Sequence, residues 1–383
     1  MAQLLTQQEL KEQRVFRSLT EALKEPSEVI VLDLSSKNLK ELSEEIIRFE
    51  NLQWLDVSEN DLVKLPDEIT SLTNLQVVKA HGNEIEELPI DIGKLERLKV
   101  FSLHQNKLKK LPESFCELHE LERLDLYVNS LERLPKNIGQ LKNIKVADLY
   151  INNLDGLPDS FDQLTNLRAV YLGSNRFKKF PAQLFGIEGL EILDLGDNHL
   201  KKIPKEIQQL SNLNFLFLFE NKLKKLPDEL GQLITLIELD FSDNQLKVLP
   251  RTLGALTQLQ ELNLDYNKIK ELPLEITGPK SLTSLHLTFN RLEVIPDQIG
   301  DLSALNELTL DENPLLNLPE SVFQMDELKS LDLSGTSIHE IPTRVGDMES
   351  LEYLNLGDLN LSRQQQTKIR GYFSANKTIQ IVF

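Results

Sequence analysis

The sequence predicts an α/β solenoid, and two regularities support this fold class. Apolar residues recur every 23 residues from Val29 to Leu351, so fifteen repeats follow one another without an insertion or a deletion. Each repeat begins with alternating apolar residues and continues with a proline-containing segment that does not alternate. A repeat this short can bury its apolar face only against the next repeat, so the repeats must stack.

The first half of each repeat predicts a strand. Leu55 and Val57 alternate with polar residues, which is the pattern of a strand with one buried side. A proline then follows the next apolar anchor in thirteen repeats, from Pro66 to Pro342. Because proline fixes φ and lacks a donor, it favours the first turn of a short 3₁₀ or helical return segment. Parallel strands about 4.8 Å apart, backed by a bulkier layer, force the stack to curve with the strands on its concave face.

Asparagine occupies the ninth position of twelve consecutive repeats. An inward-facing amide can satisfy backbone groups that irregular chain would otherwise bury unpaired, so these side chains are expected to form a ladder along the core. The pattern stops at the end repeats, where Lys37, Thr336 and Leu359 take the position. The ladder residues are Asn60, Asn83, Asn106, Asn129, Asn152, Asn175, Asn198, Asn221, Asn244, Asn267, Asn290 and Asn313.

Both ends of the array carry signals of capping structure. Residues 7–24 have apolar side chains at helical spacing and end at Pro26, which predicts an amphipathic N-terminal helix. Ser362 is a candidate N-cap of a helix through Tyr372, followed by a final strand around Ile381. We therefore divide one continuous domain into an N-terminal capping helix, fifteen repeats and a C-terminal cap, at residues 1–28, 29–361 and 362–383.

The repeat pattern LxxLxLxxNxLxxLPxxIxxLxxL resembles the leucine-rich repeat of about 23 residues. Its LP-plus-asparagine form is similar to Ras-group and bacterial leucine-rich repeat proteins. The opening VFRSLTEALKEPSEVIVLDLSSKNL and the closing LSRQQQTKIRGYFSANKTIQIVF resemble the ends of spirochaete-type members. The resemblance covers essentially the whole chain. It implies a right-handed horseshoe that binds proteins, often as an adhesin, receptor or scaffold, and carries no chemistry of its own.

Composition narrows the classes of partner and compartment. The net charge of −18 argues against a general nucleic-acid binder, and no apolar run approaches the roughly 20 residues of a membrane span. The single Cys116 has no intrachain disulfide partner. The first residues do not form a secretory signal, so we expect a cytoplasmic protein, or a secreted or cell-surface one if a signal has been removed.

The side chains that project from the concave strands are the candidate partner-binding residues, because aromatic residues are enriched among them as they are in protein interfaces. Phe215, Phe217 and Phe219 alternate with buried leucines and are expected to be exposed together. Tyr127, Tyr150 and Tyr171 are expected to form a stacked row. The complete set is Trp54, His81, His104, Tyr127, Tyr150, Tyr171, Phe215, Phe217, Phe219, Tyr266 and Phe289.

Basic residues concentrate just past the strands of three adjacent repeats. They lie beside an acidic trough that contains Asp125, Asp148, Asp194 and Asp240, and this layout either steers a partner or is a solvated rim. The basic rim consists of Arg176, Lys178, Lys179, Lys201, Lys202, Lys222, Lys224 and Lys225.

Nothing in the sequence predicts an enzyme, a cofactor or a metal site. His81 and His104 share a position on adjacent strands, but two histidines without a third ligand make a poor zinc site, and no serine or cysteine is placed as an activated nucleophile. The leading hypothesis is a protein-recognition module. The alternatives are a self-associating structural scaffold, whose aromatic residues are covered by another copy, and a small-ligand or metal sensor that uses the two histidines. We expect the chain to be a monomer or a weak homodimer.

Overall fold

The computed structural model describes residues 4–373 and 378–383. Residues 1–3 and 374–377, which belong to the predicted caps, lie outside the described residues. Contacts within the chain divide it into two compact units. The N-terminal unit consists of Met1–Phe177 and Pro181–Leu193, and the C-terminal unit consists of Lys178–Phe180 and Asp194–Phe383.

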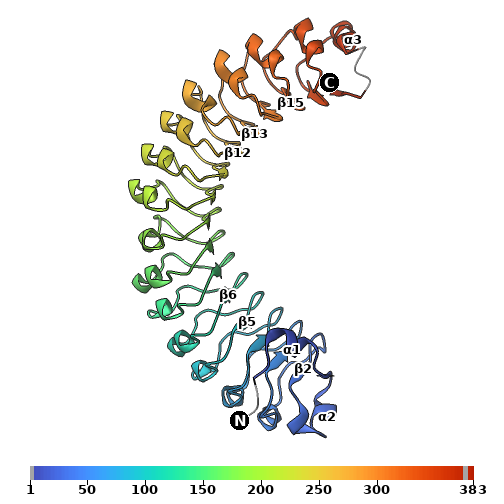
Figure 1. Ribbon diagram of the computed structural model, residues 1–383. Coiled ribbons are helices and arrows are strands. Elements are labelled where there is room, and N and C mark those ends of the chain that lie inside the picture. Colours follow the sequence, from blue (N-terminus) through green and yellow to red (C-terminus); the bar gives the residue numbers. More distant parts are fainter. Residues whose placement is uncertain (1–3, 374–377) are drawn as a thin grey trace. The chain divides into compact units, whose positions relative to one another are not determined.

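The N-terminal unit has a parallel sheet on one side and short 3₁₀ helices on the other (Figure 1). Strands pair in a register of one repeat, so Leu55 lies beside Leu32 and Val78. The strands are β1 (Val15–Phe16), β2 (Val31–Asp33), β3 (Trp54–Asp56), β4 (Val77–Lys79), β5 (Val100–Ser102), β6 (Arg123–Asp125), β7 (Val146–Asp148) and β8 (Ala169–Tyr171). A further strand, β9 (Ile192–Asp194), has its last residue in the C-terminal unit. The helices are α1 (Gln7–Lys11), α2 (Leu19–Ala22), η1 (Pro26–Glu28), η2 (Glu44–Arg48), η3 (Asp67–Ser71), η4 (Ile92–Lys94), η5 (Glu113–Glu117), η6 (Ile138–Gln140), η7 (Asp159–Gln163) and η8 (Ala182–Gly186).

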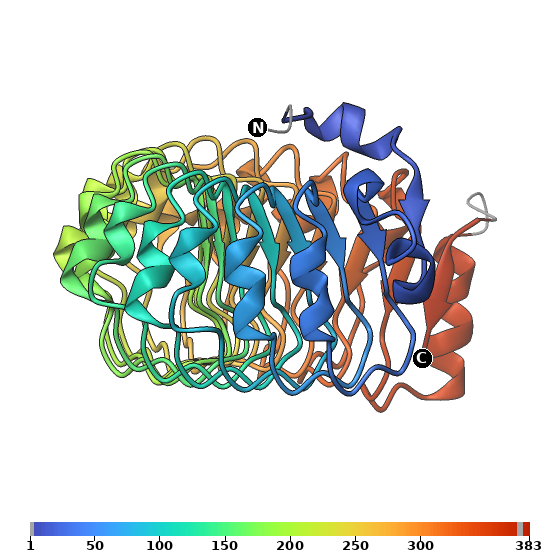
Figure 2. The same ribbon diagram turned by 90° about the horizontal axis from the view of Figure 1, so that it is seen from below.

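The C-terminal unit repeats the same arrangement (Figure 2). Its strands are β10 (Phe215–Phe217), β11 (Glu238–Asp240), β12 (Glu261–Asn263), β13 (Ser284–His286), β14 (Glu307–Thr309), β15 (Ser330–Asp332), β16 (Tyr353–Asn355) and β17 (Gln380–Val382). Its helices are η9 (Lys205–Gln209), η10 (Asp228–Gln232), η11 (Arg251–Ala255), η12 (Leu274–Thr277), η13 (Asp297–Asp301), η14 (Glu320–Gln324), η15 (Thr343–Asp347) and α3 (Arg363–Tyr372). The predicted alternation of strand and 3₁₀ return segment is confirmed in both units.

The asparagine ladder is confirmed, and it holds the turn after each strand. Asn152 Nδ2 donates to the carbonyl oxygens of Leu126 at 3.0 Å and Leu149 at 3.1 Å, while its Oδ1 accepts the N–H of Leu131 at 2.9 Å. One amide therefore ties the turn of its own repeat to the preceding repeat. The same bonds recur at Asn60 and at Asn313, the two ends of the ladder.

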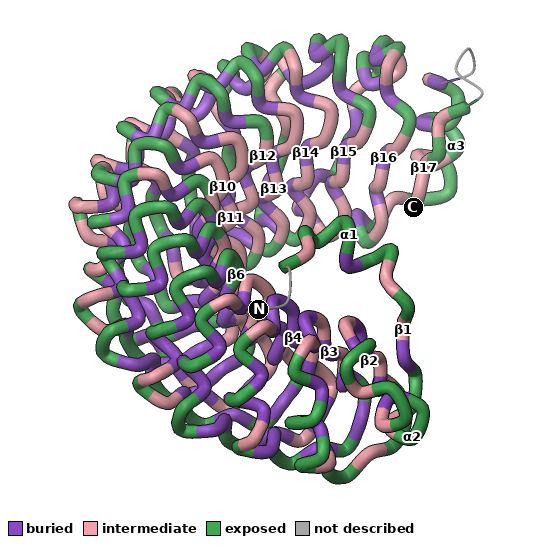
Figure 3. Tube along the Cα trace, turned by 60° about the horizontal axis from the view of Figure 1, so that its bottom comes forward, coloured by how far each residue is buried: buried purple, intermediate pink, exposed green. Residues whose placement is uncertain are grey.

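The residue before each ladder asparagine has a left-handed backbone conformation, which the sequence analysis did not predict. Figure 3 shows buried and exposed stretches alternating along the repeats. Counting the first apolar residue of a repeat as position 1, this residue is position 8, and its φ is 55° at Glu59, 56° at Val128 and 53° at Ile151. Glycine, asparagine and aspartate tolerate this region, whereas β-branched residues are strained in it.

The two caps differ in how well they match the expectation. At the C-terminal end, Ser362 N-caps α3 and Gln365 completes a capping box, and β17 pairs with β16, as predicted. At the N-terminal end the prediction of one helix over residues 7–24 was wrong, because α1 and α2 are separated by β1, which pairs with β2. The side chain of Ser18 caps α2 and Phe16 is fully buried, so the segment between the helices is held as a strand.

Cys116 lies in η5 and is buried, and burial raises the pKa of its thiol to about 12. A thiol with so high a pKa is a packing group rather than a nucleophile.

Among the described residues, no helix is both long and apolar enough to cross a membrane.

Candidate functional site

Three rings stack in a row on the strand face of the N-terminal unit. His81, His104 and Tyr127 occupy position 7 of successive repeats, just past β4, β5 and β6. The ring centroids are 4.4 Å apart in both pairs, with interplanar angles of 12° and 10°. Parallel strands in register place equivalent side chains one strand spacing apart, which is close to the separation of stacked rings. The row is therefore preorganised by the repeat itself.

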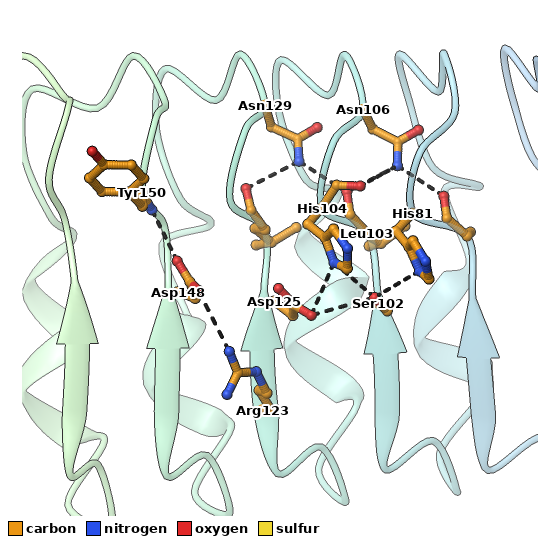
Figure 4. Close-up of polar contacts among 12 residues, drawn as sticks. His81, Ser102, Leu103, His104, Asn106, Arg123, Asp125, Asn129, Asp148 and Tyr150 are labelled. Carbon is orange, nitrogen blue, oxygen red and sulfur yellow. Dashed lines mark hydrogen bonds and ion pairs between the residues drawn. The ribbon is translucent and has the colours of Figure 1, made fainter. Parts of the chain in front are cut away.

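A polar cluster supports this row from the strand side (Figure 4). Nδ1 of His104 lies 3.0 Å from Ser102 Oγ and 3.2 Å from Asp125 Oδ2, while Nδ1 of His81 lies 3.3 Å from the same Ser102 Oγ. Burial lowers the pKa of His81, and the neighbouring His104 lowers it further, so its neutral form is favoured.

The cluster does not have the geometry of a catalytic triad or of a metal site. In a triad the histidine contacts the nucleophile through one ring nitrogen and the carboxylate through the other. Here Ser102 and Asp125 both contact Nδ1 of His104. Within residues 4–373 and 378–383, no group of three histidine, cysteine, aspartate or glutamate side chains could hold a metal ion. The hydrogen bonds of this cluster fix the orientation of the His104 ring.

Aromatic and β-branched side chains meet just beyond the ring row. Tyr127 and Val128 follow β6, Tyr150 and Ile151 follow β7, and Ile151 is 42% exposed. We term these four residues the β6–β7 patch. Both β-branched residues lie at position 8, so each holds a left-handed φ that is unfavourable for its side chain.

The expected stacked row of tyrosines was wrong. Among the described residues Tyr127 stacks on His104, and no ring contact joins it to Tyr150 or Tyr171. Tyr171 belongs to β8 itself at position 5, whereas the other two tyrosines lie at position 7, past the strand ends. Residues two positions apart along parallel strands are offset, which separates the ring of Tyr171 from the other two. The offset does not explain the missing contact between Tyr127 and Tyr150, which share position 7.

Trp54 and Lys79 form a second contact on the strand face of the N-terminal unit. Lys79 Nζ lies 5.1 Å from the centroid of the Trp54 ring and 3.4 Å from Asp56 Oδ2. The ammonium is therefore held by a cation–π contact and an ion pair, and both Trp54 and Lys79 are half-buried.

The three phenylalanines of the C-terminal unit lie on the strand face, but they are half-buried rather than exposed. Phe215 and Phe217 lie on β10 with ring centroids 6.5 Å apart. The ring of Phe219 lies over Gly196, where a Cβ would come within 2.4 Å of it. Each ring is thus partly covered by the protein, so the expected exposed stripe is smaller than the sequence indicated.

Tyr266 and Phe289 are the more exposed aromatic pair of this unit. They are 49% and 44% exposed, and their rings stack with centroids 4.8 Å apart. Both lie at position 8 with φ values of 53° and 50°. This pair combines exposure with an unfavourable backbone region, as the β6–β7 patch does.

The residues of the predicted basic rim and acidic trough differ in how far they are exposed. All eight residues of the basic rim are exposed, and the four aspartates of the acidic trough are half-buried on the strands. Asp148 Oδ2 lies 3.6 Å from Arg123, but burial raises its pKa and outweighs the hydrogen bond from the N–H of Tyr150. Asp240 accepts hydrogen bonds from the N–H and the hydroxyl of Ser242.

A half-buried carboxyl in the C-terminal unit, that of Asp265, has a raised pKa. Burial raises the pKa of Asp265 to about 6, although the N–H of Thr288 donates to its Oδ1 at 2.6 Å. His286 lowers the pKa and Asp311 raises it, and Asp311 itself accepts a hydrogen bond from the hydroxyl of Thr288 at 2.7 Å. The charged form of Asp265 therefore opposes folding.

Asp265→Asn is expected to raise the free energy of unfolding at pH 7 by about 1 kcal/mol, a value reduced for solvent screening at a half-buried group. Because the carboxyl has a higher pKa in the folded than in the unfolded protein, wild-type stability falls as pH rises from about 4 to about 6, and the amide removes this fall. Urea unfolding across this pH range measures both effects. Parallel pH profiles for wild type and variant would contradict the assignment, and Glu293→Gln, an exposed carboxyl of the same unit, is the control.

Family models and solved structures agree on what this chain is similar to. A leucine rich repeat model matches residues 165–223, 220–269 and 303–361, and a second matches 51–72 and 281–302. No curated protein matches the chain.

Three solved structures illustrate the range of similarity. A leucine-rich repeat protein of Leptospira interrogans is 34% identical, with a TM-score of 0.82 over 97% of this chain and 100% of its own. The plant peptide hormone receptor RGFR1 in complex with RGF2 is 25% identical, with a TM-score of 0.68 over 85% of this chain and 62% of its own. An Arabidopsis thaliana receptor kinase ectodomain in complex with Casparian strip integrity factor 2 is 30% identical, with a TM-score of 0.58 over 89% of this chain and 48% of its own. With its 23-residue register, asparagine ladder and parallel strands, the chain belongs to the leucine-rich repeat family and resembles its spirochaete-type members.

Proposed function

We propose that this protein is a non-enzymatic recognition module that binds a protein partner on its strand face, centred on the β6–β7 patch. The plant receptors to which it is similar are solved as complexes with peptide or protein ligands, which supports a binding role. Adhesion or host interaction, which the resemblance to bacterial leucine-rich repeat proteins implies, is the setting that we propose.

The observation that carries this proposal is the choice of Val128 and Ile151 at position 8. Most other repeats place Ser, Glu, Gln, Asp or Gly there, and those residues keep the turn soluble. A β-branched residue in the left-handed region costs about 1–2 kcal/mol and exposes apolar surface. These two side chains do not stabilise the fold at position 8, whereas binding to a partner would bury their apolar surface.

Tyr127 and Tyr150 give the patch the character of an interface. Both are half-buried, and Tyr127 is fixed by its stack on His104. A ring held in place before binding loses little conformational entropy when a partner covers it. Rigid aromatic anchors beside apolar side chains are the usual composition of energetically dominant interface residues.

The combined Tyr150→Ala and Ile151→Asn substitutions are expected to weaken partner binding at least about tenfold. Asparagine accepts a left-handed backbone, so the thermal midpoint should not fall because of the change at position 8. The wild-type protein is used to capture partners from extracts of the source organism and its host. Each captured protein is purified, and surface plasmon resonance measures its affinity for the wild type and for the variant.

Glu59→Asn is the matched control, because Glu59 also lies at position 8 of the N-terminal unit with a φ of 55°. It should leave binding unchanged. A partner that binds the Tyr150 and Ile151 variant as tightly as wild type would reject the β6–β7 patch as the site. A mass that rises with concentration in wild type alone would identify the partner as a second copy of the chain.

A further inference from the structure

A hollow of about 600 Å³ lies among the rim segments of the C-terminal unit. Three consecutive repeats contribute to it just past their strands, and every lining residue belongs to this unit. The lining residues are Lys178, Lys179, Phe180, His199, Lys201, Lys202, Pro204 and Lys222.

The hollow carries an uncompensated positive charge on an acidic protein. Five lysines and one histidine line it, no carboxylate does, and the chain as a whole has a net charge of −18. None of these five lysines has an ion-pair or hydrogen-bond partner in the part of the chain that the structure describes, whereas Lys79, Lys94 and Lys107 each lie against a carboxylate. Like charges held together without counter-charges attract an anionic partner.

The lining also includes apolar groups. Phe180 is 8% exposed and Pro204 is half-buried, and both line the hollow beside the lysines, whose side chains have aliphatic stems. A ligand that offered only charge would leave these groups unused. A peptide whose carboxylates flank a large apolar side chain matches both features, because its ring or branched chain fills the hollow while its carboxylates reach the ammonium groups.

We infer that this hollow, termed the lysine hollow, binds an acidic segment of a partner protein whose carboxylates flank a large apolar side chain. The lysine hollow is separate from the β6–β7 patch, and the inference does not rest on the proposed function. Lysine suits such a ligand because its flexible stem adapts an ammonium to carboxylates at several positions.

The test uses a fluorescein-labelled peptide of glutamates around one central phenylalanine, titrated with the full chain and followed by fluorescence anisotropy. Lys178→Glu combined with Lys201→Glu should weaken binding at least about tenfold. Lys247→Glu combined with Lys270→Glu changes the net charge by the same amount at the same repeat position, outside the lysine hollow, and should change affinity less than about twofold. All four lysines are exposed, so folding should be unaffected, which thermal unfolding checks.

Three further arms distinguish the ligand classes. A glutamate peptide without phenylalanine should bind several-fold more weakly, while heparin and single-stranded DNA should compete poorly for the labelled peptide. Equal weakening by the two lysine pairs would overturn the inference, because it would show a response to net charge alone. Equal affinity with and without phenylalanine, or tighter binding of heparin or DNA, would also overturn it, because the site would then be one for polyanions in general.

Discussion

Asn152→Leu is expected to lower the free energy of unfolding by about 3 kcal/mol. The leucine has a similar volume but leaves the carbonyl oxygens of Leu126 and Leu149 and the N–H of Leu131 without the amide that satisfies them. Asn152 is 6% exposed, so water cannot replace the lost bonds without opening the turn. Urea unfolding followed by circular dichroism measures the change.

Asn152→Thr is the matched control, because the chain already carries threonine at the same position of the fourteenth repeat. There the hydroxyl of Thr336 donates to the carbonyl oxygen of Leu333 at 2.7 Å, the equivalent of the bond to Leu149. The threonine variant should therefore lose only about half as much free energy of unfolding as the leucine variant. If leucine and threonine destabilise equally, or if neither does, the ladder does not hold the turns.

The sequence was sufficient to predict the repeat, because its signals are periodic. Leu55, Val57 and Asn152 each have counterparts one repeat away with the same role, so a local pattern seen many times identifies strand, core and ladder. The strands pair in the predicted register, and the ladder amides bond backbone groups as expected. The C-terminal cap was predictable for a different reason, since Ser362 and Gln365 form a local capping box.

Features that depend on contacts between segments distant in the sequence were not predictable. The N-terminal segment reads as one helix by apolar spacing, but pairing of β1 with β2 overrides that pattern. The partial burial of Phe219 depends on Gly196 one repeat earlier, and the ring row depends on His81 and His104 having the same position as Tyr127. The left-handed conformation of position 8 does have a signal in the sequence, because most repeats place Glu, Asp, Ser or Gly directly before the asparagine.

The second large change in stability is expected at glycines of the 3₁₀ helices. Gly139 lies buried in η6, and a Cβ there would come within 1.9 Å of the carbonyl oxygen of Ser160 in η7. Backbone oxygen cannot move aside as a flexible side chain can. The same close approach recurs at Gly93 and Gly231, where a Cβ would lie 2.2 and 2.3 Å from a backbone oxygen of the next repeat. Glycine at these sites therefore sets how closely neighbouring 3₁₀ helices pack.

Gly139→Ala is expected to lower the free energy of unfolding by about 2 kcal/mol, because η6 and η7 must separate to admit the methyl group. Gly156→Ala is the control: nothing lies within 4 Å of a Cβ at this exposed position, so alanine should raise stability by up to about 1 kcal/mol through a less flexible unfolded chain. Urea unfolding of both variants compares the two signs directly. Equal effects at the two positions would mean that the spacing of the 3₁₀ helices is soft, and that the strands and the asparagine ladder alone fix the separation of the repeats.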